Sequence, residues 1–260
     1  MKPIGVFDSG VGGLTVVAAL RQCLPKESIL YLGDTARLPY GTKSASTVQR
    51  YTERNLKFLS SRGVKAVVVA CNTASALALP HLRFDHPTWG VVEPGAEWAA
   101  KMTRNDRIGV IATESTVRSD AYGEALRRWR PEAAVFSHAC PLFVPLVEEG
   151  WLDGEVVEAV ARRYLEPLRR AEVDTVVLGC THYPMLKPIL QRVLGDEVHL
   201  ADSAQIVAQK VSQGLAAADL LEPTAEGLVQ TCLTDAGESF ARLARQILGD
   251  LPSEPEWVDV

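Results

Sequence analysis

Cysteine and long hydrophobic segments are both scarce in this chain of 260 residues. The five cysteines are widely spaced and odd in number, a poor basis for a disulfide framework, so we expect free thiols in a reducing compartment. The N-terminal apolar run ends at Asp8 and is too short for a signal peptide. No stretch approaches the roughly 20 apolar residues of a membrane span. These absences predict a cytoplasmic protein that does not bind membranes.

The chain also lacks a large excess of positive or negative charge. The formal net charge is only -5, and no long run of Lys or Arg is present. Nucleic-acid binding is therefore not expected as the main function. No segment is dominated by Pro, Gly or Ser, so no flexible linker is predicted. Hydrophobic residues make up 47% of the chain, which suits the core of one large or two small domains.

Two phosphate-binding signatures are incomplete. The segment 8–13 reads Asp-Ser-Gly-Val-Gly-Gly, but Thr15 stands where the dinucleotide fingerprint needs its last glycine. The segment 41–44 is not a P-loop, because Lys43 does not directly follow the glycine. Phosphate cofactors are therefore not predicted. The glycines of 8–13 would still expose backbone N–H groups at a helix start, either as a carboxylate site or as a tight strand–helix turn.

Apolar runs alternate with helical stretches along the chain. Five runs rich in branched residues lack polar alternation, as is typical of strands buried on both faces of a parallel sheet: Ile4–Phe7, Ile29–Leu32, Val64–Ala70, Ile108–Ala112 and Val173–Leu178. Helix signals lie between them, such as Asp153 as an N-cap before an apolar stripe within residues 157–168. This alternation predicts an α/β fold.

The order of features repeats at nearly the same separation. Ile4-Gly5-Val6 recurs as Ile108-Gly109-Val110, and Val67–Cys71 recurs as Val176–Cys180. We therefore predict two pseudo-symmetric domains, each a mostly parallel sheet flanked by helices, with the active site at their interface. The second domain is expected at residues 97–206. The first is expected to be discontinuous, residues 1–96 plus 207–260, because the C-terminal helix and strand signals should return to it.

Cys71 and Cys180 occupy matching positions in the repeat. Each ends an apolar strand and is followed by small hydrogen-bonding side chains. Ligands of open α/β sheets bind beyond the carboxyl ends of the strands, so two facing domains would place one thiol on each wall of a cleft. A helix start predicted at each cysteine would favour the thiolate. Such a pair suits a reaction that needs a base on one face of a substrate and an acid on the other. Inert buried thiols are the alternative.

The neighbours of these cysteines carry further polar groups. Asn72, Thr73 and Thr181 can bind substrate polar groups or cap helices. His182 can act as an acid or base beside the second thiol. A zinc site is disfavoured, because the paired Cys or His spacing of such sites is missing. Glu148, at the end of an apolar run, would by itself mark only a solvated boundary.

Taken together, these motifs resemble the glutamate racemases of the cofactor-independent aspartate/glutamate racemase superfamily. The resemblance runs nearly from end to end. It is carried by residues 4–13, 31–35, 39–41, 70–74, 140–148, 179–184 and 233–235.

The resemblance implies interconversion of L- and D-glutamate without pyridoxal phosphate or any other cofactor or metal, in a homodimer that supplies D-glutamate for bacterial peptidoglycan. Cys71 and Cys180 would be the acid/base catalysts, with Asp8, Glu148 and His182 as supporting catalytic groups. The substrate-binding residues would be Asp8, Ser9, Tyr40, Gly41, Asn72, Thr73, Thr181 and His182.

Three other functions fit parts of the same pattern. An aspartate racemase would share the fold and differ in pocket length. A hydrolase with a cysteine nucleophile would form an acyl-enzyme and leave the second cysteine without a role. A binding module would hold a small dicarboxylate between inert thiols and show no turnover.

Overall fold

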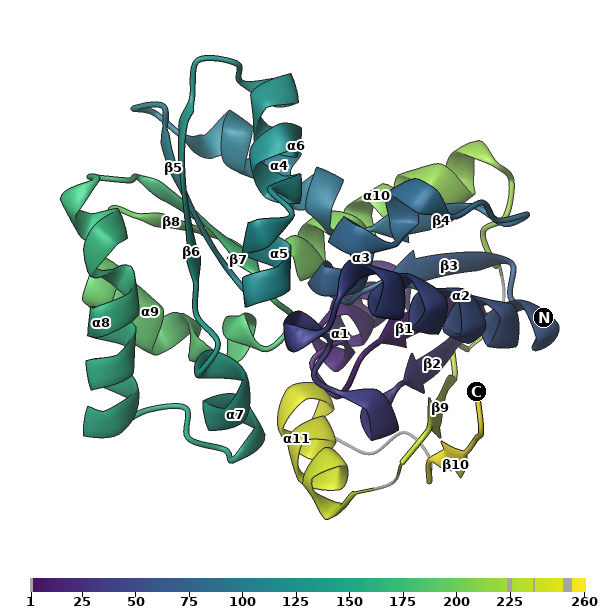
Figure 1. The fold of residues 1–260 in the computed structure, drawn as a ribbon. Helices are drawn as coiled ribbons and strands as arrows, with labels where there is room; N and C mark the ends of the chain where they lie inside the picture. The colour runs from purple at the N-terminus through teal and green to yellow at the C-terminus, as the bar shows by residue number, and fades with distance from the viewer. Residues whose placement is uncertain (1, 224–225, 236, 250–253) are drawn as a thin grey trace.

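The described residues form two parallel sheets with helices packed on their faces (Figure 1). The structure is a computed structural model and describes residues 2–223, 226–235, 237–249 and 254–260. The first sheet has the order β10 (Glu256–Trp257), β9 (Val229–Leu233), β2 (Ile29–Gly33), β1 (Ile4–Asp8), β3 (Ala66–Val69) and β4 (Thr88–Gly90). The second has the order β6 (Ala134–Ala139), β5 (Arg107–Ala112), β7 (Thr175–Gly179) and β8 (His199–Ala201).

The helices alternate with these strands along the chain. The α-helices are α1 (Leu14–Cys23), α2 (Ala45–Ser61), α3 (Asn72–Leu77), α4 (Val92–Met102), α5 (Glu114–Arg118), α6 (Ala121–Trp129), α7 (Phe143–Glu148), α8 (Glu155–Arg170), α9 (Lys187–Leu194), α10 (Ser203–Ala217) and α11 (Glu238–Leu248). The 3-10 helices are η1 (Thr35–Arg37), η2 (Tyr40–Thr42), η3 (Leu79–His81) and η4 (Tyr183–Leu186).

The two sheets repeat one topology. The order β2-β1-β3-β4 in the first sheet corresponds to β6-β5-β7-β8 in the second, and the neighbouring strands are parallel throughout. All five apolar runs contain a strand, and every residue of β1, β3 and β7 is buried. The predicted α/β fold with two pseudo-symmetric parallel sheets is therefore confirmed. Burial on both faces explains why these strands lack polar alternation.

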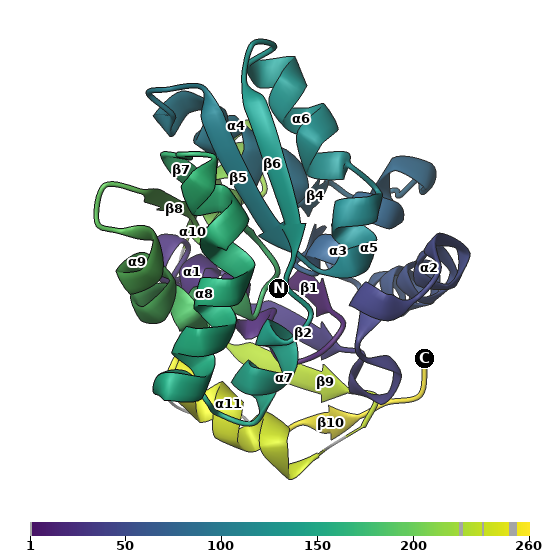
Figure 2. The same ribbon diagram turned by 60° about the vertical axis from the view of Figure 1, so that its left-hand side comes forward.

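The helix after the fourth strand of each sheet crosses to the other half. Helix α4 follows β4 but packs on α6 and β7, whereas α10 follows β8 but packs on α1. The two crossing helices also contact each other. Figure 2 shows β5 and β6 of the second sheet running toward the first sheet. We use "lobe" below for each sheet together with the helices packed on it.

The C-terminal part of the chain joins the first lobe. Strand β9 pairs with β2, and α11 packs on α1. The predicted division of the chain at residues 96 and 207 stays a prediction, and both positions fall inside helices, α4 and α10. Among the described helices, none is long and apolar enough to cross a membrane.

The predicted N-cap at Asp153 is wrong. Helix α8 begins at Glu155, and Gly154 precedes it with φ +100° and without a side-chain cap. This left-handed conformation turns the chain so that the Asp153 carboxylate accepts a hydrogen bond from the Gly154 N–H (2.8 Å) and pairs with Arg192 (3.1 Å). The apolar stripe of α8 does face the core, with Val157 buried among the hydrophobic side chains.

A buried ion pair ties the segment after α10 to the first lobe. Lys65 Nζ lies 2.6 Å from Glu27 Oε2, and the side chains are 10% and 3% exposed. Lys65 also donates to the Leu220 carbonyl (2.6 Å), and Glu27 Oε1 accepts from the Glu222 N–H (2.7 Å). The pair therefore holds together three segments that are far apart in the sequence.

Replacing Lys65 by Met should destabilise the protein by about 3 kcal/mol, because it leaves the Glu27 carboxylate buried without its counter-ion. The matched control is Lys57→Met at the exposed pair Lys57–Glu53 (2.7 Å), where we expect less than about 0.5 kcal/mol. Urea unfolding of both variants measures the difference. Equal losses in the two variants would contradict this account of the buried pair.

Candidate active site

A small cavity lies between the lobes, at the carboxyl ends of β1, β3 and β7. Its lining residues are Ser9, Gly10, Leu38, Pro39, Tyr40, Gly41, Cys71, Asn72, Thr73, Thr113, Val144, Glu148, Cys180, Thr181 and His182. Every residue predicted for the site lines this cavity except Asp8, which is fully buried and hydrogen-bonded to Thr181. The cavity volume is about 30 Å³, which is room for roughly two water molecules.

Cys71 begins helix α3, as predicted. It is the N-cap residue, and its Sγ accepts a hydrogen bond from the Ala74 N–H (3.5 Å) while its S–H donates to Ser9 Oγ (3.5 Å). Burial, and next the nearby Asp8 carboxylate, raise the pKa of the Cys71 thiol to about 12 despite these hydrogen bonds. Cys71 is therefore a protonated thiol at neutral pH in this arrangement.

Cys180 does not begin a helix, so that prediction is wrong. Residues 180–182 form a turn closed by the Tyr183 N–H and the Cys180 carbonyl (3.1 Å), and the 3-10 helix η4 starts at Tyr183 with Pro184 in its first turn. Pro184 has no backbone N–H, so it cannot donate a hydrogen bond to Cys180 Sγ. Instead, Cys180 Sγ lies 3.8 Å from His182 Nδ1.

His182 links Cys180 to Glu148. Its Nε2 lies 3.2 Å from Glu148 Oε1. Burial by itself disfavours the imidazolium, but the hydrogen bonds to Cys180 and Glu148 outweigh burial and raise the pKa of His182 to about 10. The protonated ring thus places a positive charge beside the Cys180 sulfur. Arg242, on α11 of the first lobe, donates to the Glu148 carbonyl (2.5 Å) and holds that end of α7.

Asp8 binds the glycine-rich turn from inside the protein. Its Oδ2 accepts from the Gly10 N–H (2.9 Å), and its Oδ1 accepts from Thr181 Oγ1 (3.3 Å). Burial raises the pKa of Asp8, although the nearby His182 and these hydrogen bonds act in the opposite direction. The protein's own carboxylate thus occupies the Gly10 N–H, and a carboxylate site at the other N–H groups of this turn stays a prediction.

The same turn brings the two lobes into direct contact. A Cβ atom at Gly12 would clash with Thr181 Oγ1 and stand 2.7 Å from His182 Nδ1. Only glycine therefore allows the loop after β1 to approach the loop after β7 this closely. The tight-turn interpretation of residues 8–13 is the one that the structure supports.

Asn72 and Thr73 both line the cavity and make different hydrogen bonds. Asn72 Oδ1 accepts a hydrogen bond from the Tyr122 hydroxyl (2.5 Å), whereas its Nδ2 is buried and has no partner among the described residues. Thr73 Oγ1 lies 2.9 Å from Thr113 Oγ1 and 3.2 Å from Thr116 Oγ1. Among the described residues, the Asn72 amide nitrogen is therefore a buried donor without a partner.

Tyr40 and Gly41 lie on η2 at the edge of the cavity. The Tyr40 hydroxyl donates to the buried Asp34 carboxylate and accepts from Asn55 Nδ2 (3.0 Å). Burial, and next the Asp34 charge, raise the pKa of Tyr40, so the hydroxyl stays protonated and committed to Asp34. Tyr40 thus contributes a fixed wall, and Gly41 packs directly on Thr113 of the second lobe.

Sequence reasoning missed Thr113, Thr116 and Tyr122. Thr113 and Thr116 follow β5, as the cysteines follow β3 and β7. Polar residues just after a strand of an open α/β sheet are candidates for ligand binding, so the sequence did contain a signal for these two threonines. Tyr122 gave no comparable signal, because it lies on α6 and reaches Asn72 only through the tertiary fold.

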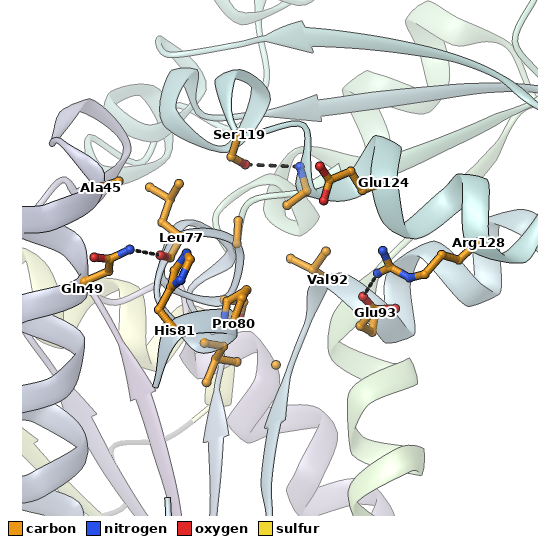
Figure 3. A pocket seen from close by; sticks show the side chains of 15 residues that line it. Ala45, Gln49, Leu77, Pro80, His81, Val92, Glu93, Ser119, Glu124 and Arg128 are labelled. Atoms are coloured by element: carbon orange, nitrogen blue, oxygen red, sulfur yellow. Dashed lines mark hydrogen bonds and ion pairs between the residues drawn. The ribbon is translucent and has the colours of Figure 1, made fainter. Parts of the chain in front are cut away.

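A larger cavity lies elsewhere between the lobes. It has a volume of about 670 Å³ and lies between α2–α3–η3 and α4–α6 (Figure 3). Its rim carries the ion pair between Arg128 and Glu93, and its lining includes His81 but neither Cys71 nor Cys180. Within the part of the chain that the structure describes, no three His, Cys, Asp or Glu side chains gather in a metal-binding arrangement.

The comparisons with known proteins give the class of this protein. The Asp/Glu/Hydantoin racemase family matches residues 13–211, so the chain belongs to that family of racemases. Its similar relatives are glutamate racemases. That of Geobacter metallireducens is 52% identical, over 95% of this chain and 93% of the relative.

Solved structures give the same result. The crystal structure of glutamate racemase isoform RacE1 from Bacillus anthracis has a TM-score of 0.96 and 39% identity, and the match covers 100% of this chain and 98% of that one. Glutamate racemase from Francisella tularensis, solved in complex with D-glutamate, has a TM-score of 0.94 and 36% identity, with coverage of 99% and 97%.

The charge state of His182 is directly measurable. In the wild-type protein we expect the imidazole to titrate near pH 10, so that it stays protonated through neutral pH. Glu148→Gln removes one of the interactions that raise this pKa and should move it down toward 6.5, the ordinary value for histidine. NMR of the ring nitrogens checks this, with the exposed neighbour Glu149→Gln as a control that leaves the pKa unchanged. A His182 ring that is neutral at pH 7 in the wild type would contradict the assignment.

Proposed function

We propose that the protein interconverts L- and D-glutamate by an acid/base mechanism that uses two thiols. The observation that carries the proposal is that Cys71 and Cys180, from different lobes, line one cavity. The substrate comes from the relatives, because the similar proteins are glutamate racemases and one of them binds D-glutamate. A hydrolase with one nucleophilic cysteine would leave the second thiol of this cavity without a role.

The reaction needs one proton removed and one delivered. A thiolate on one face of the substrate takes the α-proton and becomes a thiol, and the C–H electron pair stays on the α-carbon. The carbanion-like state is planar, so the thiol on the other face gives its proton to the opposite side of that carbon and becomes a thiolate. One enantiomer has then become the other, and the two sulfurs have exchanged roles. The opposite enantiomer meets the enzyme in this exchanged state.

The surroundings of the two sulfurs set their starting states. Burial and Asp8 keep Cys71 protonated, whereas the protonated ring of His182 stands beside the Cys180 sulfur. We propose that Cys180 is the base and Cys71 the acid in the resting site, with one proton shared by the pair. Glu148 acts by keeping His182 charged, and Asp8 by disfavouring charge on Cys71 and by holding Thr181.

Substrate polar groups would meet donors on both walls. The unpaired Nδ2 of Asn72 offers N–H groups to a carboxylate, and Ser9, Thr73 and Thr181 offer hydroxyl groups. Tyr40 and Gly41 close the edge of the site. Because a cavity of about 30 Å³ is smaller than glutamate, the lobes must separate to admit the substrate and close again to exclude water.

The wider role is proposed from the same resemblance. The protein would supply D-glutamate for peptidoglycan in the cytoplasm, as a homodimer and without a cofactor. All five cysteines are free, which suits a reducing compartment. An aspartate racemase remains the second candidate, and relative rates on the two amino acids separate the two activities.

Replacing either cysteine tests the mechanism. Cys71→Ala and Cys180→Ala should each reduce racemisation by about 1,000-fold or more, because each removes one of the two proton carriers. Each variant should still eliminate a good β-leaving group from one enantiomer of a substrate analogue, and the two variants should prefer opposite enantiomers. Chiral chromatography measures both activities, with the exposed Cys23→Ala as the control at full activity. Full racemisation by either active-site variant would exclude the two-thiol mechanism.

A further inference from the structure

Tyr122 contacts the residue next to each of the two cysteines. It lies on α6 in the second lobe and is 2% exposed. Its hydroxyl donates to Oδ1 of Asn72, the residue after Cys71, at 2.5 Å. Its ring packs on Gly179, the residue before Cys180, where a Cβ would stand 3.1 Å from Tyr122 Cε2. One buried side chain thus bridges the two segments that carry the thiols.

We propose that Tyr122 is a positioning residue, which fixes the Asn72 amide with its Nδ2 toward the substrate carboxylate. This inference rests on the proposed function, since it assigns the unpaired donor to a glutamate carboxylate.

The hydrogen bond engages the oxygen end of the Asn72 amide. The Tyr122 hydroxyl occupies Asn72 Oδ1, so the nitrogen end of the amide is left over. That nitrogen is buried and has no partner among the described residues. A buried donor without a partner is unfavourable, and a bound carboxylate would supply the missing acceptor. If the amide were reversed, its carbonyl oxygen would face the carboxylate and repel it.

The tyrosine is held so that it can serve as this fixed donor. Its ring lies between Gly179 on β7 and Gly95 on α4, where a Cβ would stand 3.4 Å from Cε1. Neither side leaves space for the ring to swing away. Burial, and next the nearby Cys180, raise the pKa of Tyr122, so its hydroxyl keeps its proton throughout the working pH range.

Tyr122→Phe tests the proposal, because it keeps the ring and its packing while removing the hydroxyl. The Asn72 amide would then be free to reverse. We expect KM for glutamate to rise about tenfold while kcat changes by less than about threefold, since the lost contact serves substrate and transition state alike. The matched control is Tyr164→Phe, whose hydroxyl binds the Leu142 N–H (3.3 Å) outside the cavity lining and whose loss should leave KM unchanged.

A double-mutant cycle separates positioning from general stability. In an Asn72→Ala background the amide is gone, so adding Tyr122→Phe should change kcat/KM by less than about twofold. If Tyr122 served only to stabilise the fold, its replacement would lower kcat/KM equally in both backgrounds. That additive result, or an unchanged KM in Tyr122→Phe alone, would overturn the proposal.

Calorimetric binding of D-glutamate distinguishes this inference from the proposed function. We expect the affinity to fall about tenfold in Tyr122→Phe, in parallel with KM. A wild-type protein that binds glutamate without racemising it, together with weaker binding by the variant, would support the positioning role and reject the racemase. Racemisation by the wild type with equal binding by the variant would reject the positioning role alone. A wild type that neither binds nor converts glutamate would reject both.

Discussion

The site depends on the contact between the turn after β1 and the turn after β7. Gly12 leaves no room for a side chain against Thr181 and His182, so two loops from different sheets meet at backbone distance. Asp8 fixes the first of these loops internally and also accepts a hydrogen bond from Thr181 of the second. This contact brings the carboxyl ends of two parallel sheets to face each other with one thiol on each side.

The two halves of the molecule are alike in topology and different in electrostatics. Four strands of the first sheet, β2-β1-β3-β4, follow the order of the second, and in each sheet a cysteine follows the third strand along the chain, β3 or β7. Cys71 caps a helix next to a buried carboxylate, whereas Cys180 sits in a turn next to a protonated imidazole. In the proposed mechanism, symmetry of the fold supplies two equivalent positions around a substrate, and the two thiols take different roles because their neighbours differ. A racemase needs both properties, because one proton must leave and another must arrive on the opposite face.

Much of the fold could be predicted from the sequence, because its signals are local. Apolar runs such as Val64–Ala70 and Val173–Leu178 are strands buried on both faces, and the spacing of the repeat matches the repeated topology. Two helix starts were predicted wrongly. Asp153 looks like a cap in sequence, but the φ of Gly154 turns it away from α8. Cys180 looks like a helix start, but a turn and η4 follow it.

Contacts made by the tertiary fold could not be predicted in the same way. Tyr122 and Arg242 reach the site from helices that carry no motif. The asymmetry of the two cysteines arises from Asp8 and Glu148, which reach the thiol-bearing segments through packing inside each lobe, of β1 beside β3 and of α7 beside η4. Most of the residues that line the cavity could be predicted from the resemblance to a family. Their charge states and hydrogen-bond partners could be determined only from the structure.

The most direct test of the central claim is proton NMR of L-glutamate with the purified protein in D2O, in reducing buffer with a chelator and no added cofactor, together with optical rotation. The account predicts loss of the α-proton signal while the rotation decays to zero. Retention of both the α-proton signal and the rotation would contradict it.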